Sequence, residues 1–458
     1  MDQTAIAAVT GRQRRFFDTG ETLDIRYRAA ALRGLLKLVT DHEAELLEAL
    51  ALDLGKPRVE AYMCELGLVR TEIRWLLRNL RRLTRDQRVR TPLHQFPARS
   101  FRRPGPYGVT LIMSPWNYPV LLTLGPLADA LAAGNTAVIK PSAYAPATAK
   151  VLERLLDSAF PDEYVKVILG GREENAHLLA EKFDYIFFTG SKNVGKLVLE
   201  GAAKHLTPVT LELGGKSPCI IHSSADLQAA ARRVVFGKFV NCGQTCIAPD
   251  YVLCQESVRA EFLRLVRLEV ERQYGLSWRE NPHYGNIVSE KHFDRLLGLL
   301  DPGKIFLGGG SDRASRKIEP TILTDVTWAD RVMGEEIFGP ILPVLSYTDI
   351  DEVIDTVRSH EKPLALYIFA RDQAVIDRVT TRCQFGGGCI NDVIVHLAST
   401  EMPFGGVGES GMGCYHGQAG FDTFTHYKSI LRQGPVELPI RYQPHTALSE
   451  KIIRIFLK

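Results

Sequence analysis

Short apolar runs alternate with stretches of helical hydrophobic spacing through much of this sequence. The runs 109–113, 137–139, 165–169 and 185–188 are predicted buried strands, and 120–133 and 146–158 are predicted helices. A second region of the same kind begins at Glu212 and continues to about Val395. Buried strands separated by helices of roughly ten or more residues are typical of parallel sheets with crossover connections. The sequence therefore predicts an α/β fold.

The length of 458 residues is too great for one ordinary hydrophobic core and predicts about two or three domains. Residues 23–90 have helical spacing, and Gly55 is predicted to end one of these helices. Residues 91–104, which include three prolines, are predicted to form strands and turns. Hydrophobic residues make up 45% and charged residues 24%, which is typical of a globular protein and excludes disorder or a collagen-like structure.

The net charge of +3 gives no overall bias toward nucleic acid, but basic residues are concentrated in one region. Eleven arginines lie between Arg70 and Arg103, against only Glu72 and Asp86. Such a stripe could contact phosphate groups or a membrane surface. The alternative is a solvated helix face that continues into a surface hairpin. Because base-stacking aromatic residues are not interleaved there, we favour the solvated face and expect no nucleic-acid partner.

Cysteine usage and the absence of a leader segment predict the compartment. No Cys-x-x-Cys pair or His-Glu-x-x-His motif is present, so no metal site is expected. Residues 1–20 lack the apolar core of a signal peptide, and scattered cysteines fit a reducing environment, so we expect a cytoplasmic protein. The apolar runs are too short to span a membrane. The amphipathic segment 451–458 is expected to be a packed terminal helix rather than a bilayer contact.

The segment 241–249, NCGQTCIAP, places Cys246 just past a glycine turn with small polar neighbours. A nucleophilic thiol needs exposure, a shaped backbone and hydrogen-bond donors for the oxyanion that it creates. Glu212 precedes a Gly-Gly turn and offers a carboxylate that could act as a general base. Cys242 could be a resolving thiol, although a small core residue is the more common role, and Cys219 is expected in a buried strand.

With both segments in view, the chain resembles the aldehyde dehydrogenase superfamily over nearly its whole length. The segments 241–251, 403–408 and 415–417 are similar to the class 3 branch, which includes oxidisers of fatty and aromatic aldehydes. The resemblance implies NAD(P)-dependent oxidation of medium- or long-chain aliphatic or aromatic aldehydes to carboxylic acids. It also implies a Rossmann-like cofactor domain, an α/β catalytic domain and a small β oligomerisation element.

The resemblance implies a role for each residue of the reacting centre. Cys246 attacks the aldehyde carbonyl, and the side-chain amide of Asn117 with the Cys246 backbone N–H holds the oxyanion. Hydride transfer to the nicotinamide leaves a thioester, which Glu212 hydrolyses by activating a water. No basic residue lies within 241–249, and the nearest in sequence is Lys238. Whatever lowers the pKa of the Cys246 thiol must therefore come from elsewhere in the fold.

The cofactor residues are transferred in the same way. The strand–turn–helix segment 188–195 is expected to bind pyrophosphate, Lys140 the adenine ribose, and Glu336 with Phe338 the nicotinamide and its ribose. Asn391 matches an asparagine near the catalytic pocket. The implied cofactor-binding set is Trp116, Lys140, Gly190, Ser191, Gly195, Glu336 and Phe338.

The sequence departs from the family pattern at Ala143, three residues after Lys140. Many members have a glutamate there, which bonds both ribose hydroxyls and repels a 2′-phosphate. Because the carboxylate is missing, we expect NADP to be used at least as well as NAD, unless another acidic group replaces it in space. The roles of Tyr118, at the substrate entrance or in the core, and of His416, near the site or in packing, stay open.

The expected domains are 1–211 for NAD(P) binding, 212–395 for catalysis, and 396–458 for a C-terminal arm, oligomerisation element and tail. The hairpin 84–104 is expected to contribute to oligomerisation, so the partner is a second copy in a homodimer. Two alternatives remain. A CoA-acylating reductase would pass the acyl group to CoA and would not need Glu212. A non-catalytic protein would use the basic stripe to bind an anionic surface.

Overall fold

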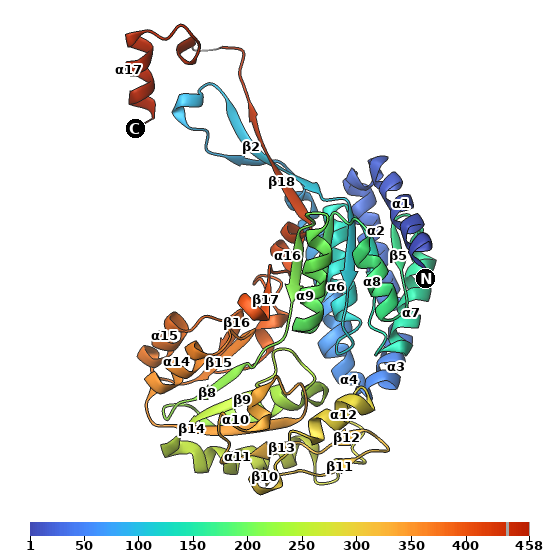
Figure 1. The fold of residues 1–458 in the computed structure, drawn as a ribbon, viewed down its shortest axis with the longest axis vertical. Helices are drawn as coiled ribbons and strands as arrows, with labels where there is room; N and C mark the ends of the chain where they lie inside the picture. Colours follow the sequence, from blue (N-terminus) through green and yellow to red (C-terminus); the bar gives the residue numbers. More distant parts are fainter. Residues whose placement is uncertain (437–438, 458) are drawn as a thin grey trace.

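The computed structural model describes residues 1–436 and 439–457 as three main sheets and one two-stranded ribbon, with their covering helices. The two larger sheets form the body of the molecule, and the third projects from it (Figure 1). Both large sheets are mainly parallel, which confirms the predicted α/β fold.

The first large sheet has six strands in the order β17-β7-β6-β3-β4-β5. Its five parallel strands are β3 (Val109–Met113), β4 (Thr136–Lys140), β5 (Val165–Val167), β6 (Tyr185–Thr189) and β7 (Val209–Glu212). All residues of β3, β4 and β6 are buried, as expected for strands covered by helices on both faces. The crossover helices are α6 (Leu121–Ala133), α7 (Pro146–Ala159), α8 (Arg172–Ala180) and α9 (Lys192–Ala203).

The helices before this sheet are α1 (Gln3–Asp18), α2 (Ile25–Asp41), α3 (Glu43–Leu54), α4 (Arg58–Ala61) and α5 (Gly67–Leu83). Gly55 ends α3 in the left-handed conformation, at φ 58°, as predicted. A π-helical turn, Tyr62–Leu66, joins α4 to α5. The predicted helical region extended to residue 90, but α5 ends at Leu83. Residues 87–89 instead form a strand, because the hairpin needs a partner for β2.

The second large sheet has seven strands in the order β10-β13-β14-β9-β8-β15-β16, and only β10 is antiparallel to its neighbour. Its strands are β8 (Pro218–Ile221), β9 (Tyr251–Gln255), β10 (Ile305–Leu307), β13 (Thr321–Leu323), β14 (Ile341–Tyr347), β15 (Ala365–Phe369) and β16 (Gly387–Ile390). Its helices are α10 (Leu227–Phe239), α11 (Glu256–Tyr274), α12 (Glu290–Leu297), α13 (Arg331–Gly334), α14 (Ile350–Ser359) and α15 (Gln373–Arg382). A small ribbon pairs β11 (Ser311–Asp312) with β12 (Lys317–Ile318).

The chain after β16 returns to the first sheet before it reaches the projecting one. The strand β17 (Gly411–Met412) pairs antiparallel with β7, where Gly411 lies opposite Glu212. The Cβ of any larger residue at Gly411 would lie 2.3 Å from the Leu211 carbonyl oxygen, so this pairing requires a glycine. The short helix α16 (Gly417–Thr423) then packs against α6. The glycine-rich segment thus brings backbone close to the end of β7.

The projecting sheet consists of β1 (Gln87–Val89), β2 (Arg99–Pro106) and β18 (Thr425–Arg432), with β2 in the centre. The terminal helix α17 (Ala447–Phe456) lies beyond it, at the far end of the molecule from the second large sheet (Figure 1). The predicted helix is present, but Leu448, Ile455 and Phe456 remain exposed within the single chain. The expectation that it packs is therefore only partly met, because among the described residues it mainly contacts the neighbouring turn Pro439–Arg441 and the hairpin tip Leu93–Gln95.

The arginines of the basic stripe lie on the exposed side of α5 and on the hairpin. Arg74, Arg78 and Arg81 are exposed on α5, and Arg103 pairs with Asp86 on the hairpin. This placement agrees with a solvated helix face that continues into a surface hairpin. Among the helices of the described residues, none is long and apolar enough to span a bilayer.

Candidate active site

A cavity of about 640 Å³ lies where the two large sheets meet. Parallel α/β sheets bind ligands beyond the carboxyl ends of their strands. The part of the chain that forms the first sheet contributes the residues after β6 and the end of β7. The part that forms the second sheet contributes the loop before β9 and the segment before β14. Of the residues predicted from the sequence, Cys246, Glu212, Asn117, Trp116, Gly190, Ser191, Glu336 and Phe338 line this cavity.

The loop that presents Cys246 has an unusual backbone. Asn241, Cys242 and Gly243 have successive φ angles of 53°, 53° and 71°, in the left-handed region. The Cβ of any residue larger than glycine at position 243 would lie 2.3 Å from the Gly339 carbonyl oxygen. The turn ends the run of α10 and leaves Cys246 half-buried against the cavity. Strained backbone of this kind persists only where surrounding contacts enforce it.

The surroundings of Cys246 disfavour its thiolate form. Burial raises its pKa above the usual value, and the charges of Glu336 and Glu212 raise it further. Backbone N–H groups of Cys246 and Ile247 act in the opposite direction. The thiolate therefore needs a positive charge that these residues do not supply.

Cys242 and Cys219 occupy the core. Cys242 is buried in the second sheet's core cluster, and burial raises its pKa. It does not line the cavity, which favours the core role over a resolving thiol. Cys219 is buried within β8, as predicted.

Glu212 is the last residue of β7 and is only 3% exposed. Neither carboxylate oxygen has a hydrogen-bond partner among the described residues. Burial raises the pKa of this carboxyl well above its ordinary value. A buried polar group without a partner is costly, so one that lines a cavity is suited to bond a ligand or water there.

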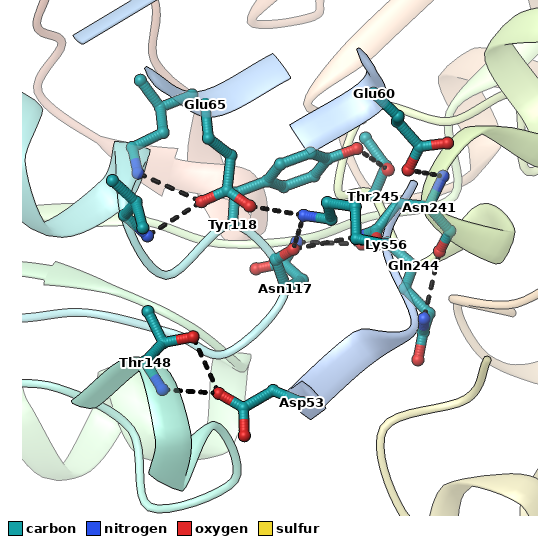
Figure 2. Close-up of polar contacts among 12 residues, drawn as sticks. Asp53, Lys56, Glu60, Glu65, Asn117, Tyr118, Thr148, Asn241, Gln244 and Thr245 are labelled. Carbon is teal, nitrogen blue, oxygen red and sulfur yellow. Dashed lines mark hydrogen bonds and ion pairs between the residues drawn. The ribbon is translucent and has the colours of Figure 1, made fainter. Parts of the chain in front are cut away.

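Asn117 is anchored to the loop that precedes Cys246. Its Nδ2 donates to the Gln244 carbonyl at 3.0 Å, and its own carbonyl accepts from Asn241 Nδ2 at 2.9 Å. An amide nitrogen carries two hydrogens, so one N–H of Asn117 is left for the cavity that this residue lines. Next to it, the Tyr118 hydroxyl bonds Thr245 Oγ1 at 2.6 Å. Tyr118 is buried in the core, where it joins the two segments, and it does not line the cavity. The structure therefore favours the core role over the substrate entrance. Figure 2 shows this meeting of segments.

The turn after β6 forms the opposite wall of the cavity. Residues 189–193 line it, and α9 starts at Lys192 with Ser191 as its N-cap residue. The first N–H groups of a helix have no partner within the helix and attract phosphate groups. A Cβ at Gly190 would lie 2.6 Å from the Phe188 ring, and one at Gly195 2.9 Å from Leu213. Gly195 therefore serves helix packing and does not line the cavity.

Glu336 lies against the Gly214–Gly215 turn. A Cβ at Gly214 would lie 2.1 Å from Glu336 Oε2, so the close approach needs glycine. Burial raises the pKa of Glu336 to about 8, while the backbone N–H of Gly215 lowers it. The ring of Phe338 meets the Trp116 ring edge-on at 5.4 Å. A helix N-terminus, an aromatic pair and a carboxylate in one cleft fit a dinucleotide with its phosphate, ring and ribose.

Besides Gly195, three expected residues lie outside this lining. Lys140 Nζ donates to the Pro141 carbonyl at 2.8 Å, and burial lowers its pKa to about 8. Ala143 is exposed just after β4. Asn391, expected near the catalytic pocket, does not line the cavity, and its side-chain amide exchanges two 2.9 Å bonds with the backbone of Ala370.

His416 also lies away from the cavity, which settles the second open role in favour of packing. It is buried, its ring stacks on Tyr415, and its Nδ1 lies 3.5 Å from Glu72 Oε2. The backbone N–H of Gly417 donates to the other oxygen of Glu72 at 2.7 Å. These contacts fix the returning tail on α5.

Several charged residues that support the site were not predicted. Lys216 Nζ pairs with Asp250 at 2.5 Å and donates to the Glu335 carbonyl at 2.8 Å. Asp250 in turn accepts from the Ile337 N–H at 2.9 Å, so this pair holds the backbone on both sides of Glu336. Lys56, Glu60 and Glu65 support the other side of the site (Figure 2). In the sequence, the only sign of these residues was their spacing, Lys-x-x-x-Glu-x-x-x-x-Glu. This spacing becomes informative only when the structure shows that Lys56 and Glu65 are buried.

Comparison with known proteins agrees with this geometry. Residues 1–430 match the family described as "Aldehyde dehydrogenase family". The chain is 46% identical to the 4,4'-diaponeurosporen-aldehyde dehydrogenase of Staphylococcus aureus, over 97% of each chain. It is 46% identical to aldehyde dehydrogenase family 3 member B1 of Bos taurus, over 96% of this chain and 95% of that one.

A solved structure gives the same result for the fold. The structure titled "Substrate bound state of Staphylococcus Aureus AldH" aligns with a TM-score of 0.97 and 45% identity, over 99% of each chain. The similarity to a family 3 member confirms the class 3 resemblance seen in the sequence. The chain belongs to the aldehyde dehydrogenase family and is an oxidoreductase of aldehydes.

Proposed function

We propose that this protein oxidises aldehydes to carboxylic acids with NAD or NADP, using Cys246 as the nucleophile and Glu212 as the base. One observation carries the proposal: a thiol and a buried carboxyl without a hydrogen-bond partner line the same cavity. The proposed substrates are medium- or long-chain aliphatic or aromatic aldehydes, as the class 3 resemblance implies.

The first step forms a carbon–sulfur bond. The Cys246 thiolate attacks the aldehyde carbon, and the carbonyl electron pair moves to the oxygen. The second N–H of Asn117 and the backbone N–H of Cys246 donate to this oxyanion. The thiol proton passes to solvent water before the attack, and burial and two acidic neighbours oppose this transfer because they raise the pKa of the thiol.

Oxidation follows when the oxyanion electron pair re-forms the C=O bond and the carbon loses a hydride. NAD(P)⁺ supplies the hydride acceptor when it is bound. In this chain, the N-terminus of α9 would hold its phosphates, Glu336 the nicotinamide ribose, and Phe338 with Trp116 the ring. The product on the enzyme is a thioester of Cys246.

Hydrolysis of the thioester needs a base. Glu212 takes a proton from a water, the resulting hydroxide attacks the thioester carbon, and the carbon–sulfur bond breaks to release the acid and Cys246. A carboxylate with a raised pKa holds a proton more strongly and is a better base than one exposed to solvent. A CoA-acylating enzyme would not need this residue.

The first test is NAD(P)H formation from a medium-chain and an aromatic aldehyde by wild type and Cys246→Ala. We expect turnover in the wild type and at least a thousandfold loss, on the order of 10³, in the variant, because the covalent route is removed. Cys383→Ala, a core cysteine outside the cavity, is the matched control and should keep its activity. Acyl-CoA formation without free acid would instead support the acylating alternative.

We further propose that NADP is used at least as well as NAD, because Ala143 leaves no carboxylate three residues after Lys140. Glu174 acts electrostatically on Lys140 and is the acidic group that we consider as a replacement for the missing carboxylate. In Ala143→Glu, we expect the NADP-to-NAD ratio of kcat/KM to fall about tenfold or more, because a carboxylate repels the 2′-phosphate. Ala143→Gln is the uncharged control. A wild-type enzyme with a strong NAD preference would contradict the proposal.

We propose a homodimer formed through the projecting sheet. Two observations support it: β18 and β16 are edge strands that a second copy could pair, and α17 exposes Leu448, Ile455 and Phe456. Light scattering should give twice the mass of the chain. Leu448→Asp should favour the monomer on dilution, whereas Leu206→Asp, at an exposed position of the first domain, should not. A monomeric wild type would exclude the dimer.

A further inference from the structure

The ion pair between Lys56 and Glu65 is buried beside the proposed site without lining it. Lys56 is 2% exposed and Glu65 is not exposed at all, and their Nζ and Oε1 atoms are 2.5 Å apart. Both residues come from the irregular connection between α3 and α5, where Gly55 ends one helix and the π-helical turn Tyr62–Leu66 precedes the next. π-helical turns are often found at functional sites.

The pair holds the backbone of the segment that carries Asn117. Lys56 Nζ donates to the Asn117 carbonyl at 2.9 Å and lies 4.2 Å above the Tyr118 ring. Glu65 Oε2 accepts from the N–H groups of Val120 and Leu121, at 2.8 and 3.2 Å. The groups that Lys56 and Glu65 contact here all belong to residues 117–121, and this segment ends at the first residue of α6 (Figure 2).

The same segment is bonded to the nucleophile loop. The Asn117 carbonyl that Lys56 contacts also accepts from Asn241 Nδ2, and the Asn117 amide donates to Gln244. Glu60, five residues before Glu65, accepts from the Asn241 N–H at 2.9 Å. Lys56, Glu60 and Glu65 therefore hold the oxyanion donor and the loop before Cys246 in one arrangement.

Stability alone is a weak reason for such a pair. Removing two charges from water is costly, and well-packed apolar residues often give equal or greater stability. Charged groups with fixed hydrogen bonds do, however, define a geometry that apolar residues leave free. An oxyanion donor acts only within a narrow range of distance and angle, so its support matters for rate.

We propose that Lys56 and Glu65 are positioning residues that orient the Asn117 amide toward the oxyanion formed at Cys246. The pair acts through Asn117 and does not touch the substrate. This inference rests on the proposed function for its consequence in aldehyde oxidation, but it also applies to any reaction in which Cys246 creates an oxyanion.

The test uses two assays in the full-length protein. One is NAD(P)H formation from an aldehyde. The other is hydrolysis of p-nitrophenyl acetate without cofactor, in which Cys246 also forms a tetrahedral oxyanion. In Lys56→Met we expect kcat to fall about 10- to 100-fold in both assays, since small misplacements of catalytic groups have effects of this size. Alkylation of Cys246 by iodoacetamide, which forms no oxyanion, should change less than about twofold.

A double-variant comparison distinguishes positioning from a general structural effect. If the pair acts through the amide, Lys56→Met should add little to the loss already caused by Asn117→Ala. Independent, multiplying losses would overturn the proposal, and so would an unchanged ester hydrolysis in folded Lys56→Met. Lys37→Met, which removes an exposed lysine paired with Asp41, is the control and should behave as wild type.

Folding of the single variant is a concern, because Glu65 would be left as an unpaired buried charge. The variant Lys56→Met/Glu65→Gln carries neither charge and still lacks the bond to the Asn117 carbonyl. It should show the same loss in ester hydrolysis, and full activity in this folded variant would refute the inference. If the wild type hydrolyses the ester but oxidises no aldehyde, the proposed function fails while the ester assay still decides the role of the pair.

Discussion

The site depends on one constraint, the meeting of the carboxyl ends of the parallel strands of the first sheet with the amino ends of the strands of the second sheet. The strands β6 and β7 of the first sheet end at the turn before α9 and at Glu212, and the loop that carries Cys246 leads into β9 of the second sheet. The residues associated with either sheet line only part of the cavity. The returning tail strengthens the junction, because Gly411 pairs with Glu212 after the chain has completed the second sheet.

Burial of acidic groups sets the electrostatics of this junction. Glu212 and Glu336 both line the cavity, and burial raises the pKa of each. Their charges raise the pKa of Cys246, so the thiol and the two carboxyls all resist ionisation. Lys238, the nearest basic residue in sequence, is buried in α10, and its Nζ has no hydrogen-bond partner among the described residues. A cationic cofactor in the cavity would relieve the same electrostatic imbalance.

Much of the fold could be predicted because it depends on local pattern. The apolar runs became β3 to β6, and Gly55 ended α3 as its position in the sequence indicated. The helical region was predicted to continue to residue 90, whereas α5 ends at Leu83 and residues 87–89 pair with β2 within the predicted hairpin. The exposure of α17 was missed because amphipathic spacing identifies a helix but not what it packs against.

The site was predictable only in part. The residues that line the cavity carry recognisable neighbours, such as the glycine turns beside Cys246 and Glu212. The bonds of Asn391 could not be predicted, because a motif does not reveal where a side-chain amide finds its partner, which here is Ala370. Lys56 and Glu65 could not be identified, because their contacts reach Asn117 and Val120 across more than fifty positions of sequence.

The most direct test is the pH dependence of pre-steady-state and steady-state NAD(P)H formation in wild type and Glu212→Gln. A base acts only when deprotonated, so the wild-type steady-state rate should rise with pH as Glu212 loses its proton, and its raised pKa should place this rise at higher pH than for an exposed glutamate. The variant should keep the first-turnover burst and lose about 10²- to 10⁴-fold in steady-state rate, together with that pH dependence. An unchanged steady-state rate and profile in Glu212→Gln would contradict the assignment of Glu212 as the hydrolytic base.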